Sequence, residues 1–136
     1  MRRTLMLAAG LFLALAPHAL AKALTAAEAK KIFFGLDMTG VFEPDGTPWR
    51  ECVKANGETI YWYRGTIDFG RLTVRNDGAL CFAYESKDYA ETDNCYRADK
   101  LGAGYRFTHV TDPGSVFVAK KAQSTKACPD PNQPSV

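Results

Sequence analysis

Two segments in which apolar and polar residues alternate, 70–84 and 93–98, constrain the fold of this chain more than any other feature. Alternation with a period of two is typical of a β-strand that buries one face. The segments therefore predict two consecutive β-hairpins with a shared buried face. The residues expected on that face of the first hairpin are Leu72, Val74, Leu80 and Phe82.

The same alternation predicts the turn of the first hairpin. A two-residue loop at 77–78 would pair Val74 with Cys81 and would scatter the apolar residues over both faces. A three-residue loop at 76–78 pairs the apolar residues with one another. It also puts Gly78 where a left-handed backbone is needed, which glycine adopts readily. We therefore predict the three-residue loop.

The N-terminal segment has the parts of a secretory signal peptide. Arg2 and Arg3 precede an apolar run over 5–16, and Ala19-Leu20-Ala21 forms a typical cleavage site. The run is shorter than the roughly 20 residues of a membrane span, so we expect no stable membrane anchor. Cleavage after Ala21 leaves one domain over 22–128 and a disordered tail over 129–136.

Charge gives no reason to expect a nucleic acid partner. The whole chain has 17 basic and 15 acidic residues, and Arg2 and Arg3 account for the excess. The exported part is therefore formally neutral.

All four cysteines follow the predicted cleavage site, so we expect an oxidising location, periplasmic or secreted, and two disulfides. Cys81 and Cys95 lie on adjacent arms of one predicted hairpin, and placing both on its outer face puts Phe82 and Tyr96 together inside. We therefore predict Cys81–Cys95. Cys52–Cys128 follows by elimination. Zinc-type spacing is absent, and we expect no metal or other cofactor.

The remaining patterns predict one helix and further strands. Thr25 and Glu28 form a capping box for a short helix from Ala26 to about Phe34. Residues 36–48 are rich in turn signals and are expected to form no strand. The predicted strands cover 49–54, 59–67, the two arms of 70–84 on either side of the loop 76–78, 93–98, 105–110 and 116–119. The fold class is therefore mainly β: a short helix followed by an antiparallel meander of about seven strands, closed into a small barrel or curled as a half-barrel.

Motifs for catalysis are absent from the sequence. His109 is the only histidine after the cleavage site and has no motif that supplies a nucleophile or carboxylate, so a structural role is expected. The serines lie in no known nucleophile motif. A hydrolase that acts through Asp or Glu is a third possibility behind two non-catalytic ones. We expect the acidic residues of 85–93 to form a solvated loop.

The first non-catalytic hypothesis is an exported binding module, a monomer that holds a small apolar ligand or an envelope component within the curled sheet. The residues expected to bind it are Trp62, Tyr84, Tyr96, Tyr105 and Phe107.

The second hypothesis is a protein that docks on another envelope protein or a host protein, acting as a binding partner or inhibitor through its outer sheet face. Arginines that share that face would make the contact, together with the acidic loop. They are Arg71, Arg75 and Arg97, with Arg106 on the same face.

The cap at 24–28, the hairpin turn at 77–78 and the cysteine segments 80–82 and 95–96 together give a resemblance to a family. The chain resembles small exported proteobacterial proteins of a domain-of-unknown-function family, and in outline it is similar to lipocalin-like barrels. The resemblance implies an exported location and a barrel fold. It implies no activity.

Overall fold

The computed structural model describes residues 23–87 and 93–132, and shows one helix and eight strands within them. The predicted signal peptide and the end of the predicted tail, 133–136, lie outside the described residues. The elements are α1 (Ala26–Phe33), β1 (Leu36–Phe42), β2 (Pro48–Val53), β3 (Glu58–Tyr63), β4 (Thr66–Val74), β5 (Leu80–Tyr84), β6 (Cys95–Leu101), β7 (Gly104–His109) and β8 (Val116–Ser124).

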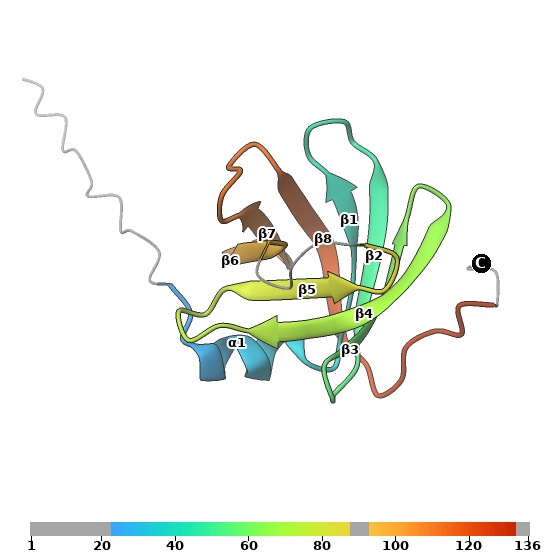
Figure 1. The fold of residues 1–136 in the computed structure, drawn as a ribbon, viewed down its shortest axis with the longest axis horizontal. Coiled ribbons are helices and arrows are strands. Elements are labelled where there is room, and N and C mark those ends of the chain that lie inside the picture. Colours follow the sequence, from blue (N-terminus) through green and yellow to red (C-terminus); the bar gives the residue numbers. More distant parts are fainter. Residues whose placement is uncertain (1–22, 88–92, 133–136) are drawn as a thin grey trace, which may run out of the picture.

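The strands form a closed antiparallel barrel in which each strand pairs with the next along the chain (Figure 1). Closure comes from β8, which pairs with β1 from Leu36↔Ser124 to Phe42↔Phe117. The predicted small barrel is confirmed, and the choice between a barrel and a half-barrel is settled in favour of the barrel. The predicted strand number is too low by one.

The missing strand is β1, whose residues were predicted to form turns. Gly40 is a turn signal in the sequence, but it lies inside the strand at a register shift against β8. A Cβ atom at Gly40 would lie 1.8 Å from the carbonyl oxygen of Val118. The glycine therefore permits a close approach of two strands, and a sequence pattern does not distinguish this role from a turn.

The predicted single strand over 59–67 is also wrong, because the chain turns at Arg64 and Gly65. Both residues have positive φ angles, 51° and 76°, as a tight hairpin turn requires. The Arg64 guanidinium also pairs with Asp45 at 2.6 Å. As a result β4 begins at Thr66 and is longer than predicted.

The predicted hairpin between β4 and β5 is confirmed. Val74 pairs with Leu80 and Leu72 pairs with Phe82, as the three-residue loop requires. Gly78 has a φ of +82°.

Both predicted disulfides are present. Cys81–Cys95 joins the paired strands β5 and β6, and Cys52–Cys128 joins β2 to the segment that follows β8.

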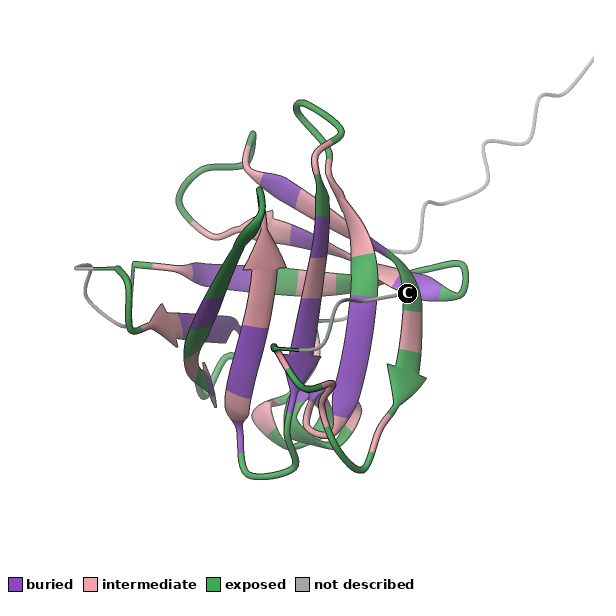
Figure 2. Cartoon of the chain, turned by 90° about the vertical axis from the view of Figure 1, so that its right-hand side faces the viewer, coloured by how far each residue is buried: buried purple, intermediate pink, exposed green. Residues whose placement is uncertain are grey.

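Helix α1 covers one end of the barrel, below the strands in Figure 1. Its capping box is formed as predicted: the Glu28 N–H donates to Thr25 Oγ1 and the Thr25 N–H donates to Glu28 Oε2. Ala29 and Phe33 are fully buried against the barrel interior. Figure 2 shows that buried segments alternate with exposed ones along the strands. The residues that fill this end of the barrel are Leu36, Val53, Leu72, Leu80 and Ala119.

Candidate functional site

A partly open cavity of about 220 Å³ lies in the half of the barrel away from α1. Because β1, β3, β5 and β7 begin at the α1 end, the loops 43–47, 64–65 and 110–115 and residues 85–87, which follow β5, lie at the opposite end. The cavity wall is mostly aromatic. The aromatic lining residues are Trp49, Tyr61, Tyr63, Phe82, Tyr84, Tyr96, Phe107 and Phe117, and the others are Met38, Glu51, Asp68, Lys87 and Asn94.

One side of the wall is a row of stacked rings from β3 and β5. The ring centroids of Tyr61 and Tyr63 are 5.7 Å apart, and those of Tyr61 and Tyr84 are 5.1 Å apart. Phe82 extends the row beyond Tyr84, at 6.1 Å. These rings give the cavity a continuous apolar surface on which a flat molecule can pack.

Gly70 makes this row possible. Tyr61 and Tyr84 lie on strands that are separated by β4, where Gly70 pairs with both Thr59 and Tyr84. A Cβ atom at Gly70 would lie 2.8 Å from the Tyr84 ring and 2.2 Å from the carbonyl oxygen of Ala83. The absent side chain therefore leaves the space across which Tyr84 reaches its neighbours.

Glu51 is a carboxyl group inside this aromatic wall. It is only 3% exposed, and it contacts two hydroxyl groups: the Tyr84 hydroxyl donates to Glu51 Oε2 at 2.6 Å, and Thr59 Oγ1 contacts Glu51 Oε1. Burial raises the pKa of Glu51 to about 8, with a smaller contribution from the charge of Asp68, while the bonds to Thr59 and Tyr84 oppose the rise. Glu51 is therefore mostly protonated at neutral pH.

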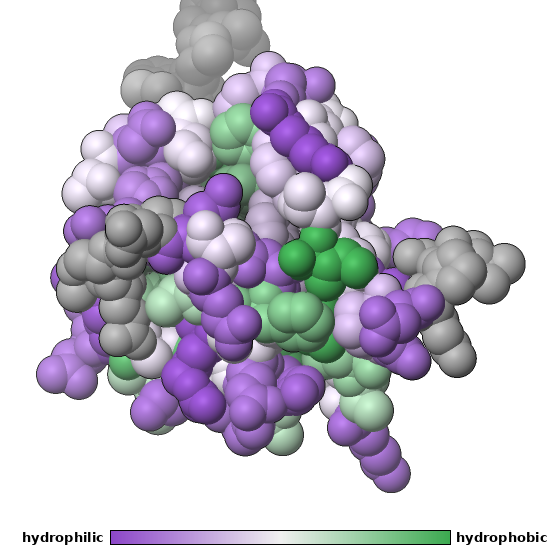
Figure 3. Space-filling model, turned by 45° about the vertical axis from the view of Figure 1, so that its right-hand side comes forward, coloured by the Kyte–Doolittle hydropathy of each residue, from purple (hydrophilic) through white to green (hydrophobic). Residues whose placement is uncertain are grey.

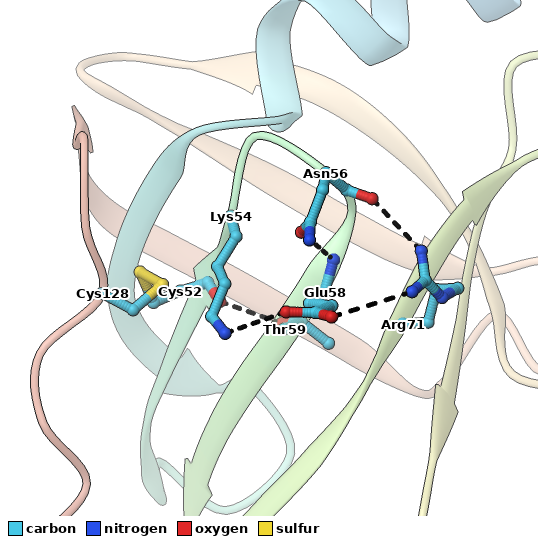
Figure 4. A network of polar contacts seen from close by, with 7 residues as sticks. All are labelled: Cys52, Lys54, Asn56, Glu58, Thr59, Arg71 and Cys128. Atoms are coloured by element: carbon cyan, nitrogen blue, oxygen red, sulfur yellow. Dashed lines mark hydrogen bonds and ion pairs between the residues drawn. A yellow bond between two sulfur atoms is a disulfide. The ribbon is translucent and has the colours of Figure 1, made fainter.

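The hydrogen bonds of Thr59 agree with a protonated Glu51. Thr59 Oγ1 also lies 3.1 Å from the carbonyl oxygen of Cys52, a contact drawn in Figure 4. One hydroxyl proton cannot serve both Cys52 and Glu51. Both contacts are satisfied when Thr59 donates to the Cys52 carbonyl and the Glu51 carboxyl donates to Thr59.

Asp68 is the second buried acidic residue of the cavity. It is 9% exposed, and it accepts hydrogen bonds from the backbone N–H of Ser86, at 3.2 Å, and from the Ser86 hydroxyl. Register places it in one row with Glu51, because Glu51 pairs with Tyr61 and Tyr61 pairs with Asp68. Among the described residues, no basic side chain lies within 4 Å of either carboxyl group.

Trp49 carries a buried hydrogen-bond donor without an acceptor. Its indole ring is 7% exposed and lines the cavity, and Nε1 has no partner among the described residues. Such a group costs about 1–3 kcal/mol when it stays unpaired. In native proteins an unpaired buried donor commonly finds its acceptor in a water or a ligand.

Three of the five predicted ligand-binding residues line the cavity: Tyr84, Tyr96 and Phe107. The other two lie elsewhere. Tyr105 packs against Phe33 of α1, with ring centroids 5.0 Å apart, and therefore belongs to the packed end of the barrel.

Trp62 lies on the outer face, opposite in phase to its neighbours Tyr61 and Tyr63. The Arg50 guanidinium lies over its ring, 5.3 Å from the centroid. Trp62 lines a shallow outer groove and does not line the cavity, so the predicted set of binding residues is corrected at this position.

The predicted arginine face is present but its charges are already paired. Arg71 lies 3.9 Å from Glu58 and also donates to the carbonyl oxygen of Asn56, within the polar network of Figure 4. Arg75 and Arg97 both contact Asp77, at 3.1 and 3.2 Å. These pairs reduce the attraction of this face for an acidic partner.

Apolar side chains are also present on the outer surface. Figure 3 shows an apolar area among hydrophilic residues on one face of the molecule. Ile67 and Phe69, which β4 presents on the outside, are 42% and 44% exposed.

His109 has a structural position at the β7–β8 connection. Its Nε2 lies 2.9 Å from the carbonyl oxygen of Asp93, and its Nδ1 accepts from the backbone N–H groups of Thr111 and Asp112. The predicted acidic loop falls partly on 88–92, outside the described residues. Within the described part of the chain, no group of three His, Cys, Asp or Glu side chains is arranged to hold a metal ion.

Glu51 and Asp68 were not predicted as site residues, although their phase is visible in the sequence. Glu51 lies two residues from Trp49 and from Val53, on the same face of its strand. Asp68 lies on the same face as Gly70 and Leu72. A charged residue in the apolar phase of a strand is the signal that identifies both.

No family model matches the sequence, and no curated protein is similar to it at a significant level. The resemblance to exported proteins of unknown function therefore stays a prediction. The two disulfides suggest an oxidising location outside the cytoplasm. No helix within residues 23–87 and 93–132 is both long and apolar enough to span a bilayer.

Proposed function

We propose that this protein is an exported, non-catalytic binding protein that holds a small, largely apolar molecule in the barrel cavity. The observation that carries the proposal is the division of the interior into a packed half beside α1 and a hollow aromatic half. Tight packing is the rule in protein interiors, so a hollow of 220 Å³ lined by eight aromatic side chains is a departure from that rule that a bound ligand accounts for.

The cavity volume limits the size of the ligand. An engineered apolar cavity of about 150 Å³ in another protein holds one benzene ring. A cavity of 220 Å³ therefore suits a molecule of one ring with a short side chain. The unpaired Nε1 of Trp49 supports an occupied state, because a ligand or a water held with it supplies the acceptor that the described residues lack.

The alternative function, docking of a protein on the outer arginine face, has less support. Arg71, Arg75 and Arg97 each have a carboxylate partner within 4 Å, so they offer little unpaired charge. Native mass spectrometry of protein purified from its own periplasm or medium separates the two functions. A bound small molecule supports the binding protein, and a bound protein supports the alternative.

Tryptophan fluorescence gives a second test, since the chain has only two tryptophans, one lining the cavity and one outside. In Trp62→Phe the remaining Trp49 reports on the cavity, and small aromatic alcohols and amines are expected to change its emission. In Trp49→Phe the remaining Trp62 is expected to stay unchanged. The proposal fails if the native protein carries no ligand and the Trp49 emission responds to none of these compounds.

A further inference from the structure

The two carboxyl groups of the cavity define the ligand further. We infer that the ligand is a small organic cation, a protonated amine on an apolar body, whose ammonium group binds at Glu51 and Asp68. This inference rests on the proposed binding function and names its ligand class.

The position of the two acidic residues favours a cation. Glu51, Tyr61 and Asp68 form one row across β2, β3 and β4, and all three line the cavity. Adjacent strands lie about 4.8 Å apart, so the two acidic residues are about 10 Å apart along the wall at their Cα atoms. An ammonium group that packs against the Tyr61 side chain lies between the two acidic residues and is attracted by the negative charge of each.

A counter-charge for these acids is missing from the described residues. Glu51 and Asp68 are 3% and 9% exposed, and no basic side chain in that part of the chain pairs with either. Lys87 lines the cavity from an exposed position after β5. A buried carboxyl group avoids the cost of an unpaired charge either by holding a proton, as Glu51 does, or by pairing with a cation. Here a cation brought by the ligand completes the site.

The choice of glutamic acid at position 51 also favours a cation. A glutamine has the same shape and satisfies Tyr84 and Thr59 without any charge to desolvate. The glutamic acid gives the cavity a group that becomes negative when a cation arrives, which an amide cannot do. The aromatic row of Tyr63, Tyr61, Tyr84 and Phe82 then packs against the apolar body.

Proton balance makes the inference measurable. Before binding, the Glu51 carboxyl holds a proton, because burial disfavours its charged form. When the ammonium group binds, that proton leaves to solvent, and a carboxylate–ammonium pair remains. Binding at pH 7 therefore releases about one proton for each ligand. At pH values below the pKa of Glu51, each increase of one pH unit should raise the affinity for the ligand up to tenfold.

The experiment uses 2-phenylethylamine and its neutral isostere 2-phenylethanol as probes, measured by titration calorimetry with the mature protein. We expect the amine to bind at least tenfold more tightly than the alcohol at pH 7.5. In two buffers of different ionisation enthalpy, the heat should show the release of about one proton for the amine and none for the alcohol.

Glu51→Gln is the decisive variant, and Glu85→Gln, at an exposed position after β5, is its matched control. Glu51→Gln should lower the ratio of amine to alcohol affinity at least tenfold and abolish proton release, while the control changes neither. Equal binding of the two probes by the unmodified protein overturns the cation inference and leaves the proposed function standing. Failure of both probes, with a purified protein that carries no ligand, overturns both.

Discussion

The hydroxyl of Tyr84 on β5 donates a 2.6 Å hydrogen bond to Glu51 on β2, across the two strands that separate them. The bond is possible because Gly70 on β4 presents no side chain between them. The missing side chain of one glycine thus allows a tyrosine of the aromatic wall to bond to the buried Glu51.

Gly70→Ala should break this connection. The new Cβ atom would meet the Ala83 carbonyl oxygen at 2.2 Å, which is backbone and cannot rotate away. We expect a loss of about 1–3 kcal/mol in the free energy of unfolding and weaker ligand binding. Denaturant unfolding of Gly70→Ala and of Gly114→Ala, which lies in an exposed turn with space for a methyl group, measures the difference. Equal stability of the two variants would contradict the prediction.

The pH dependence of stability should reveal Glu51. Its pKa rises from 4.5 to about 8 on folding, so the folded protein holds a proton that the unfolded chain loses between these values. Stability should therefore fall as pH rises from 5 to 8, by on the order of 4 kcal/mol, and level off above pH 8. Other titratable groups that line the cavity are Asp68, Lys87, Tyr61, Tyr63, Tyr84 and Tyr96.

Glu51→Gln isolates this contribution. The variant should be more stable than the unmodified protein at pH 8, and the gap should shrink toward pH 5. Thermal unfolding at several pH values, with Glu85→Gln as the control for a lost exposed charge, measures it. A gap that does not depend on pH would show that Glu51 is ionised in the folded protein.

The two disulfides should contribute unequally to the stability of the folded protein. Cys52–Cys128 closes a loop with a sequence separation of 76 residues and Cys81–Cys95 one of 14, so the loop-entropy estimates are about 4 and about 3 kcal/mol. Replacing Cys52 and Cys128 with serine should lower the melting temperature more than replacing Cys81 and Cys95. Ser124→Ala, at the end of β8, should leave it nearly unchanged. The reverse order of the two disulfide variants would show that loop entropy does not dominate their contributions.

Export should remove residues 1–21 and leave Lys22 at the N-terminus. The reason is the small-residue site at 19–21 after a short apolar run. The intact mass of the exported protein measures the cleavage. Recovery of Met1 in a membrane fraction would contradict it.

The barrel was predictable where alternation was long and uninterrupted. The hairpin of β4 and β5 and the Cys81–Cys95 pair followed from the phase of a few apolar residues. Strand β1 was not predictable in this way, because Gly40 permits the approach of a neighbouring strand that sequence alone does not reveal.

The cavity was predictable in part. Tyr84, Tyr96 and Phe107 were assigned to the interior, but Trp62 was assigned to the wrong side of β3. That strand has aromatic residues on both faces, so its own sequence does not show which of them point into the barrel. The pairing of β3 with β2 determines which side chains point inward, because Glu51 lies opposite Tyr61. The hydrogen bond between Tyr84 and Glu51 depends on the missing side chain of Gly70. It joins strands that are far apart in the sequence, so no local sequence pattern predicts it.

The pairing of β1 with β8 has a consequence for the order of folding. Six other strands lie between these two along the chain, so the barrel cannot close before residue 124 is available. Cys128 follows directly, and its bond to Cys52 crosses the same seam. A chain that passes through a membrane N-terminus first thus stays open during passage. In the folded protein the Cys52–Cys128 bond holds the last described segment against the strands that were synthesised first.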